Sequence, residues 1–211
     1  MPLQNRVTPF GDIVALAGRG LVIGNRGVLH DETRHIVRHS QVRRWIACRL
    51  EFRGRRRKIM RPRSWTELFF LDEATALAAG HRPCAECRYS DYRRFRELWI
   101  ACFGEPVGAD IMDRKLHAER IARRSKVTYR ANVRALPDGT YVAFEGAAWL
   151  VNGDKLLAWS DEGYTRRLAR PARGDVEVLT PLSIVAILDA GYRPNIHPSA
   201  LSPSFNICLQ P

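Results

Sequence analysis

The chain has 211 residues, of which 45% are hydrophobic, so it can bury a core as one compact unit or two small ones, and disorder is not its default state. Its formal net charge of +12 at pH 7, from 34 Lys and Arg against 22 Asp and Glu, makes a polyanion such as nucleic acid the first partner to consider. A basic surface without a binding role is the alternative. No run of about 18 apolar residues occurs, and the N-terminal segment does not resemble a signal peptide, so we expect a cytoplasmic protein without a membrane partner.

Short strands and tight turns are expected at the start of the chain. Glycines at positions 18, 20, 24 and 27 interrupt every apolar run there, which argues against a long helix. A glycine-rich phosphate loop of the G-x-x-x-x-G-K-[ST] type does not occur, so a nucleotide-binding loop is not predicted.

An arginine-rich hairpin is predicted next. Apolar side chains alternate from Ile46 to Phe52, which is typical of a half-buried strand, and Gly54 could turn that strand into a hairpin. Like charges so close together repel one another unless an anion neutralises them, so phosphate contact is preferred over a solvated loop. The cations of this tip are Arg53, Arg55, Arg56, Arg57 and Lys58.

Three helices and a strand are predicted between residues 66 and 125. The run TELFFL (residues 66–71) reads as a strand, and Asp72 can cap the short helix EATALAA, which Gly80 can end. The run SDYRRFRELWIACF, from Ser90, has apolar residues at helical spacing with arginines on the other side. A further helix is expected to span ADIMDRKLHAERIARRS, residues 109–125.

The second half of the chain alternates strand-like runs with turn residues, which indicates an antiparallel meander with its clearest hairpin turn at Asn152-Gly153. A last helix is expected to end at Gly191. The predicted fold class is therefore α+β: a zinc-knuckle half over residues 1–125, followed by the meander and a C-terminal helix over residues 126–211. The two halves could also form one continuous domain.

Cys84 and Cys87 form a C-x-x-C pair that suits either a redox site or a metal knuckle. A redox pair would start a helix within a βαβ unit, which the sequence does not show, so zinc is favoured over redox or structural thiols. Arg82 and Arg88 flank the pair and would help to keep the thiols deprotonated. Five cysteines, an odd number without an export signal, argue against a disulfide framework.

Residues 69–88, FFLDEATALAAGHRPCAECR, resemble the second half of the zinc-binding module of Ada-type DNA alkylation-response proteins. The resemblance implies a strand, a short Ala-rich helix and a turn that supplies two of four cysteine ligands, and a role on DNA more than on RNA. In that module a preceding Cys-x-x-x-Cys segment supplies the other two ligands, and one of these cysteines accepts a methyl group. Here that strand offers only Cys48, with Arg44 and Phe52 four residues to either side, so methyl acceptance is not carried over. The whole chain also resembles a bacterial protein family of uncharacterised function.

A zinc site is predicted from Cys48, Cys84, Cys87 and a fourth ligand, for which His39 is preferred. The other histidines considered for this position are His35, His81 and His197. Cys102 lies on the apolar face of a predicted helix and is expected to pack in the core, and Cys208 is not assigned.

The sequence therefore predicts a zinc-containing nucleic-acid-binding protein, with a possible role in DNA repair or the damage response. The residues expected to contact phosphates are Arg53, Arg55, Arg56, Arg57, Lys58, Arg82 and Arg88. The alternatives are a metal-dependent enzyme acting on DNA or RNA, such as a nuclease, glycosylase or alkyl-transfer protein, and a zinc-stabilised protein that binds other proteins. Catalytic residues remain unassigned, because no complete motif occurs. The groupings considered are Asp113 with His117, Glu67 with Asp72 and Glu73, and His30-Asp31-Glu32.

Overall fold

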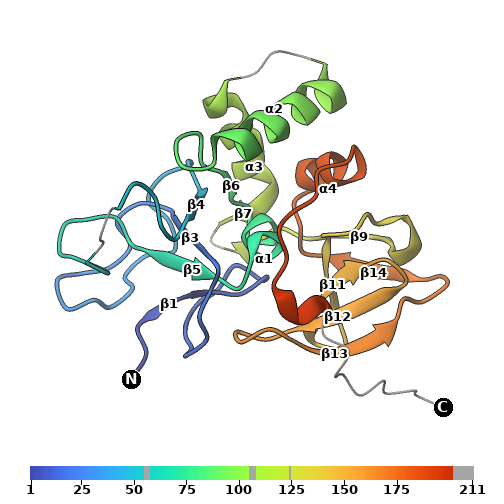
Figure 1. Ribbon diagram of the computed structural model, residues 1–211, viewed down its shortest axis with the longest axis horizontal. Helices are drawn as coiled ribbons and strands as arrows, with labels where there is room; N and C mark the ends of the chain where they lie inside the picture. The colour runs from blue at the N-terminus through green and yellow to red at the C-terminus, as the bar shows by residue number, and fades with distance from the viewer. Residues whose placement is uncertain (55–57, 105–107, 124, 202–211) are drawn as a thin grey trace.

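The computed structural model describes residues 1–54, 58–104, 108–123 and 125–201. It has the mixed α+β architecture that the sequence predicts, with two six-stranded sheets and one two-stranded ribbon. Figure 1 shows the two large sheets on opposite sides of the molecule, with α1 between them and the other helices above. Among the described residues, no helix has the length and apolar character needed to cross a bilayer.

The N-terminal sheet has the strand order β2-β1-β5-β3-β4-β6. Its strands are β1 (Gln4–Val7), β2 (Ile13–Ala15), β3 (Val22–Asn25), β4 (Ile46–Arg49), β5 (Leu68–Phe70) and β6 (Arg82–Pro83). β4 pairs antiparallel with β3 and parallel with β6. The parallel register aligns Ala47 with Pro83, so the residue that follows Pro83 lies close to Cys48.

The expected arginine-rich hairpin does not form in the described part of the chain. Between Leu50 and Glu67 the described residues contain turns and no strand, and the next strand, β5, pairs with β3 and β1. The physical reason is that β3 and β6 already occupy both edges of β4. A strand returning from Gly54 would therefore find no free hydrogen-bonding edge on β4.

Helix α1 (Glu73–Ala78) begins and ends as the sequence predicts. The Asp72 carboxylate accepts a hydrogen bond of 2.8 Å from the backbone N–H of Thr75, which satisfies a free amide of the first turn. At the other end Gly80 takes a φ of +85° and donates its N–H to Leu77 O at 2.8 Å. This left-handed glycine turns the chain sharply into β6 and the two cysteines.

Helix α4 (Leu182–Asp189) ends with the same device. Gly191 has a φ of +105° and donates its N–H to Leu188 O at 3.0 Å. The similarity between the segments AGHRP and AGYRP therefore reflects a shared way of ending a helix, as the sequence suggested.

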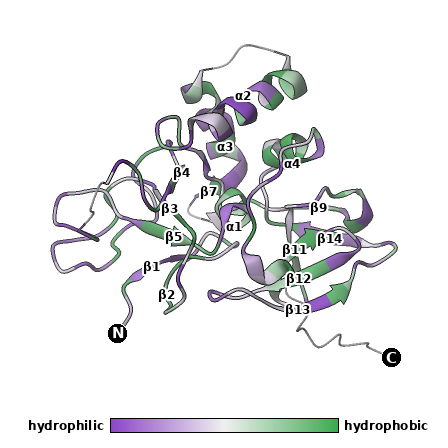
Figure 2. Ribbon diagram, viewed as in Figure 1, coloured by the Kyte–Doolittle hydropathy of each residue, from purple (hydrophilic) through white to green (hydrophobic). Residues whose placement is uncertain are grey.

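The three longer helices pack together in one apolar layer. They are α2 (Tyr89–Phe103), α3 (Ala109–Arg120) and α4. Phe95, Leu98 and Trp99 lie on the buried side of α2, as its helical spacing predicts. They join side chains of α3 and α4, among them Met112 and Ile187, in one core cluster. Figure 2 shows hydrophobic residues along α4 and hydrophilic ones along much of α2.

The C-terminal sheet confirms the predicted meander. Its order is β13-β12-β11-β10-β14-β9, so β10 to β13 are consecutive neighbours, while β14 and β9 continue the sheet beyond β10. Its strands are β9 (Tyr129–Asn132), β10 (Tyr141–Phe144), β11 (Ala147–Asn152), β12 (Lys155–Trp159), β13 (Tyr164–Ala169) and β14 (Asp175–Val178). Asn152 pairs with Lys155, so the two residues between them form the expected tight turn. The shorter elements are β7 (Ile121–Ala122), β8 (Ser125–Lys126) and the 3₁₀ helices Val133–Ala135 and Pro198–Leu201.

Buried polar contacts join the two sheets through α1. The hydroxyl of Tyr164 in β13 donates to the Asp72 carboxylate at 2.6 Å, and the hydroxyl of Tyr141 in β10 lies 3.1 Å from Thr75 Oγ1. Because Asp72 and Thr75 lie at the start of α1, and Ala76 and Ala79 pack in the core of the N-terminal sheet, this helix links the N-terminal sheet to the C-terminal one.

Candidate metal centre and adjoining cleft

Three cysteines from two segments meet beside β4. Their Sγ atoms all lie within 4.8 Å of one another, and Cys48, Cys84 and Cys87 are 4%, 8% and 6% exposed. All three are free thiols. The group could therefore hold a metal ion, and the predicted convergence of Cys48 with the C-x-x-C pair is found.

Backbone pairing sets the position of the cysteines. The N–H of Cys84 donates to Ala47 O at 2.9 Å, which extends the β4–β6 ladder by one residue. Two further N–H groups point at sulfur, from Glu86 to Cys84 Sγ and from Arg49 to Cys87 Sγ, each at 3.4 Å. Hydrogen bonds to a thiolate favour its charged form, so this turn suits the deprotonated sulfurs that bind metals.

The acidity of the thiols is unequal. The hydrogen bond from Cys48 lowers the pKa of Cys84 to about 5, whereas the same bond and burial raise the pKa of Cys48. Burial raises the pKa of Cys87. Apolar side chains from Ile23, Ile46, Phe52 and Phe69 surround the group. Thiolate donors of this kind select soft or borderline ions such as Zn²⁺.

His39 does not lie with the cysteines. Its Nε2 is 2.9 Å from Arg26 Nη1 and 3.0 Å from Gly11 O, and its ring centroid is 5.6 Å from that of Trp45. In the described ranges, no fourth Cys, His, Asp or Glu joins the three sulfurs. His39 is therefore not the fourth ligand in this structure, because Arg26, Gly11 O and Trp45 hold its ring away from the three sulfurs.

The other histidines and cysteines lie elsewhere. His35 contacts Thr33, His81 meets Phe70 edge to face with ring centroids 4.6 Å apart, and His197 Nδ1 is 2.8 Å from Ser199 Oγ. Cys102 is partly buried against α4, where its Sγ approaches Ala186 O at 3.6 Å. Cys208 lies outside the described residues.

Arg82 and Arg88 bind carboxylates and do not face solvent. Arg82 makes two hydrogen bonds to Asp113, at 2.9 and 2.7 Å, and is 2% exposed. Arg88 is 4% exposed and contacts Glu73 at 2.7 Å and Asp91 at 2.8 Å. The expectation that they contact phosphates is corrected, because both guanidinium groups are enclosed in buried ion pairs that hold α1, α2 and α3 against the cysteine turn.

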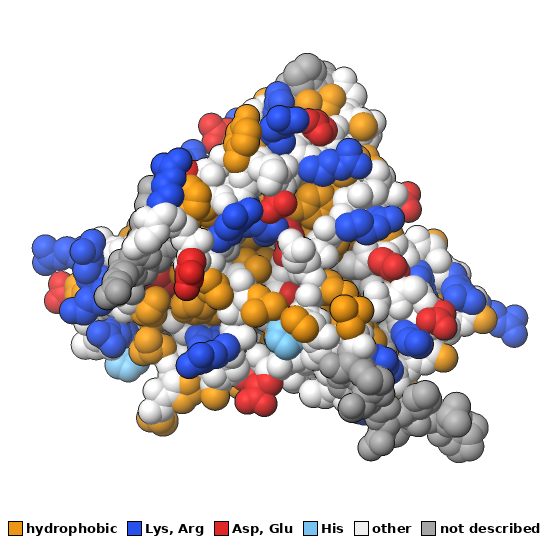
Figure 3. All heavy atoms as spheres, viewed as in Figure 1, with side chains coloured by type: hydrophobic (Ala, Val, Ile, Leu, Met, Phe, Trp, Pro, Cys, Tyr) orange, Lys and Arg blue, Asp and Glu red, His pale blue; other side chains and the backbone are white. Residues whose placement is uncertain are grey.

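The remaining predicted phosphate contacts are only partly described. Arg53 and Lys58 are exposed, whereas Arg55, Arg56 and Arg57 lie outside the described residues. Figure 3 shows Lys and Arg side chains spread over the face in view, with fewer acidic ones between them.

The acid–base groupings have structural partners. Asp113 is bound to Arg82, and His117 Nδ1 lies 3.3 Å from Arg120 Nη2, so the two residues do not form a catalytic pair. Glu67 accepts the N–H of Met60 at 2.7 Å. Asp113, His117 and Glu67 therefore each have a partner within the fold.

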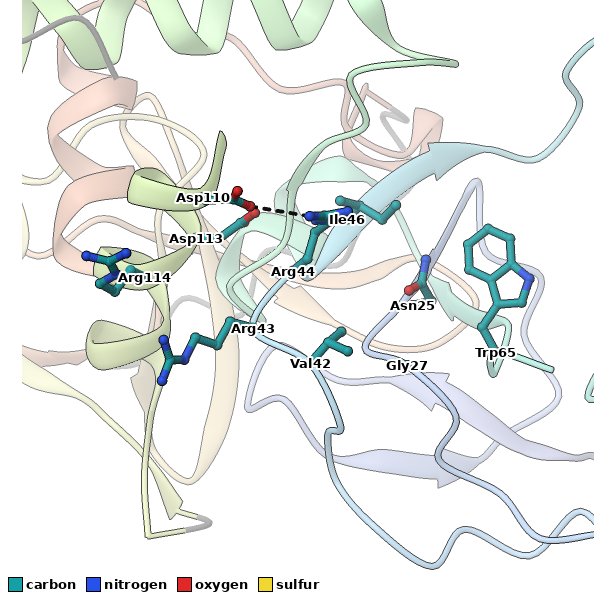
Figure 4. Close-up of a pocket in the computed structure, with 10 residues that line it drawn as sticks. All are labelled: Asn25, Gly27, Val42, Arg43, Arg44, Ile46, Trp65, Asp110, Asp113 and Arg114. Carbon is teal, nitrogen blue, oxygen red and sulfur yellow. Dashed lines mark hydrogen bonds and ion pairs between the residues drawn. The ribbon is translucent and has the colours of Figure 1, made fainter. Parts of the chain in front are cut away.

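A cleft of about 830 Å³ lies between the N-terminal sheet and α3, and the sequence did not reveal it. Figure 4 shows Arg43, Arg44 and Arg114 on one side and Trp65 on the other, with Asn25 and Val42 between them. Its walls come from β3, from the segment leading into β4, from the segment before β5 and from α3, so no short motif could have indicated it.

Two buried arginines pack beneath the segment of residues 42–45, which lines this cleft. The guanidinium groups of Arg26 and Arg120 each lie 4.0 Å from the ring of the buried Trp45. Arg26 donates to Gly11 O, and Arg120 donates to Gly80 O. Within the described part of the chain neither guanidinium makes a salt bridge, and Arg26 Nη2 and Arg120 Nε have no hydrogen-bond partner. Burial lowers the pKa of Arg120 to about 9, so the group is charged at neutral pH.

Comparisons of this chain with protein-family models, with curated proteins and with solved structures find no match.

Proposed function

We propose that this chain is a zinc-containing nucleic-acid-binding protein in which Cys48, Cys84 and Cys87 hold the ion. The observation that carries the proposal is the approach of the three sulfurs to within 4.8 Å of one another. Zinc–sulfur bonds of about 2.3 Å in a tetrahedron separate the sulfurs by roughly 3.8 Å, so small side-chain adjustments suffice to close the site. Water or another ligand would take the fourth position.

Nucleic acid is the proposed partner because of charge. A net charge of +12 attracts polyanions, and Arg53 and Lys58 are exposed beyond β4. The resemblance of residues 69–88 to the Ada-type zinc module supports DNA over RNA and a place in DNA repair or the damage response. Zinc would act by fixing the corner between β4, β6 and α2.

The metal is tested by elemental analysis of the purified chain and of two serine variants. One zinc per chain is expected, retained in Cys102→Ser and lost in Cys84→Ser. Cys102 is the matched control because it lies on α2 against Ala186, away from the sulfur group. A folded, metal-free native chain that also fails to take up added zinc would overturn this part of the proposal.

Nucleic-acid binding is tested by retention of labelled DNA and RNA at several salt concentrations. If about six phosphates are contacted, the logarithm of the affinity should fall with the logarithm of the salt concentration with a slope of about −5. A native chain that retains neither polymer at low salt would contradict the proposal. Charge reversal of Arg53 and Lys58 without any change in retention would show that other cations make the contacts.

A metal-dependent enzyme acting on DNA or RNA is the second candidate. The observation that favours it is the set of three protein ligands, since catalytic zinc sites combine three protein ligands with a water or substrate. Zinc-dependent turnover of modified or damaged DNA, lost in Cys84→Ser and kept in Cys102→Ser, would support it. If the chain binds nuclease, glycosylase and alkyl-transfer substrates but converts none of them, the enzyme candidate is rejected and only the binding function remains.

A further inference from the structure

The cleft between the N-terminal sheet and α3 has one aromatic side and one basic side. Trp65 is 43% exposed and Val42 is 41% exposed, so each presents apolar surface to the space of about 830 Å³. In Figure 4 the indole of Trp65 stands across the cleft from Arg43 and Arg114. An exposed indole in a basic groove is the arrangement on which nucleobases stack.

The basic side carries an excess of positive charge. Asp113 is neutralised by Arg82 at 2.7 Å, and Asp110 accepts from Arg44 at 3.3 Å. Arg43 and Arg114 are exposed and make no ion pair within the described residues. These two guanidinium groups are therefore available to a phosphate.

Buried charge strengthens the positive potential of this side. Arg120 Nη2 donates to the backbone carbonyl of Arg43, and the indole N–H of Trp45 donates to Val42 O at 2.9 Å. The wall at residues 42–45 is thus fixed directly to the stack of Arg26, Trp45 and Arg120. Because low-dielectric protein screens charge poorly, the buried guanidinium group of Arg120, which is charged at neutral pH, adds to the field that an anion meets in the cleft.

Asn25 supplies an unsatisfied donor between the two sides. Its side chain is 7% exposed and lines the cleft, and its Nδ2 has no hydrogen-bond partner in the described structure. Buried donors of this kind are normally satisfied, so the geometry favours a ligand with an acceptor at this point.

We propose that this cleft binds one unstacked nucleotide, with its base against Trp65, a base or sugar acceptor on Asn25 and its phosphate on Arg43 and Arg114. The inference rests on the proposed nucleic-acid function and names the substrate within it: single-stranded nucleic acid, not a closed duplex. A free nucleotide carries the same base, sugar and phosphate groups, so the test compares a single strand with a free nucleotide.

Binding is measured by fluorescence anisotropy with a labelled 12-nucleotide single strand and the matching duplex, and by calorimetry with a nucleoside monophosphate. The native chain is expected to bind the single strand most tightly. Trp65→Ala should weaken that binding about 10- to 100-fold, and Trp65→Phe should restore part of the loss. Arg43→Ala and Arg114→Ala should each reduce the salt slope by about 1.

Two matched controls show whether the effects belong to the cleft. Tyr89→Ala removes an aromatic ring that is 59% exposed on α2, and Arg173→Ala removes an exposed arginine beside β14. Both should leave affinity and salt slope unchanged. Thermal unfolding of every variant checks that losses of binding do not reflect unfolding.

The results of these experiments distinguish a wrong assignment of the cleft from a wrong assignment of nucleic-acid binding. Undiminished single-strand binding by Trp65→Ala and by the Arg43→Ala, Arg114→Ala double variant would overturn the cleft assignment and leave nucleic-acid binding in place. Binding of the monophosphate alone, lost in Trp65→Ala, would make the free nucleotide the ligand and overturn the nucleic-acid function. A native chain that binds none of the three probes would overturn both.

Discussion

Arg88 Nη2 lies 2.7 Å from Glu73 Oε2, and both side chains are buried directly beside the cysteine turn. Glu73 is the first residue of α1, and Arg88 precedes α2, so this ion pair holds the two helix beginnings together. The Tyr192 hydroxyl and the Asn195 N–H also donate to Glu73, at 2.6 and 3.0 Å. Arg88 is therefore part of the scaffold that positions Cys84 and Cys87.

Removing only the arginine of the Arg88–Glu73 pair should strongly destabilise the fold. Arg88→Met leaves a buried carboxylate without its cation, and we expect the free energy of unfolding to fall by about 3 to 5 kcal/mol. Urea denaturation measures this loss. The control is Arg93→Ala, which removes the exposed Arg93–Glu97 pair of 3.5 Å and should cost about 1 kcal/mol or less. Equal small losses in both variants would show that the buried pair does not support the fold.

Zinc should stabilise the folded chain. An ion that binds only the folded state at 100 times its dissociation constant raises the free energy of unfolding by about 2.7 kcal/mol. Chelator-treated protein should therefore have its unfolding midpoint at a lower urea concentration than zinc-loaded protein. The difference should vanish in Cys87→Ser and persist in Cys102→Ser. Identical unfolding midpoints with and without zinc in the native chain would speak against a bound ion.

Lys126 should make stability depend on pH. Burial, with a contribution from Arg26, lowers the pKa of Lys126 to about 7, whereas an unfolded lysine titrates near 10.4. Between these values the unfolded chain binds a proton that the folded chain does not. The free energy of unfolding contributed by this group therefore rises between about pH 7 and pH 10, by an amount on the order of 4 kcal/mol, and is constant below that window.

The variant Lys126→Met should remove this rise. Its control is Lys155→Met, because the Lys155 side chain is 49% exposed. Urea denaturation at pH 7, 8 and 9 should give a smaller positive slope for Lys126→Met than for the native chain and the control. Parallel slopes in all three proteins would mean that the Lys126 ammonium keeps its ordinary pKa in the fold.

Gly80 should tolerate a side chain less well than Gly104. Both have a positive φ, +85° and +81°, so alanine costs about 1 to 2 kcal/mol of backbone strain at either position. A Cβ at Gly80 would also lie 2.5 Å from Arg120 Cδ, whereas no atom of the described residues lies within 4 Å of a Cβ at Gly104. Gly80→Ala should therefore lose about 1 to 3 kcal/mol more than Gly104→Ala in urea denaturation. Equal losses would indicate that Arg120 moves aside freely.

Local patterns in the sequence predicted the local structure. The spacing of Phe95, Leu98 and Trp99 predicted the buried side of α2, and the Asn152-Gly153 pair predicted a hairpin turn, because each depends on neighbours in the chain. Asp72 likewise caps the helix that follows it. The approach of Cys48 to Cys84 and Cys87 was also anticipated, from a resemblance together with the strand pattern.

Features that depend on distant partners were not predicted. Asp113 is 31 residues from Arg82, so the sequence could not show that this arginine is enclosed in an ion pair. The alternating apolar residues before Gly54 suggested a hairpin that does not form, because the sequence could not show that both edges of β4 are occupied. The cleft could not be predicted either, because Trp65 and Arg114 line the same space only in the folded chain.

The contacts of Glu73 and Asp72 also set an order of assembly during translation. Tyr192 and His197, which donate to them, leave the ribosome 119 and 125 residues later. Before those residues emerge, Glu73 can pair with Arg88 and Asp72 can accept from Thr75, but each buried carboxylate still lacks at least one of its donors. The corner beside α1 therefore acquires its full set of hydrogen-bond donors only after residue 197 has been made.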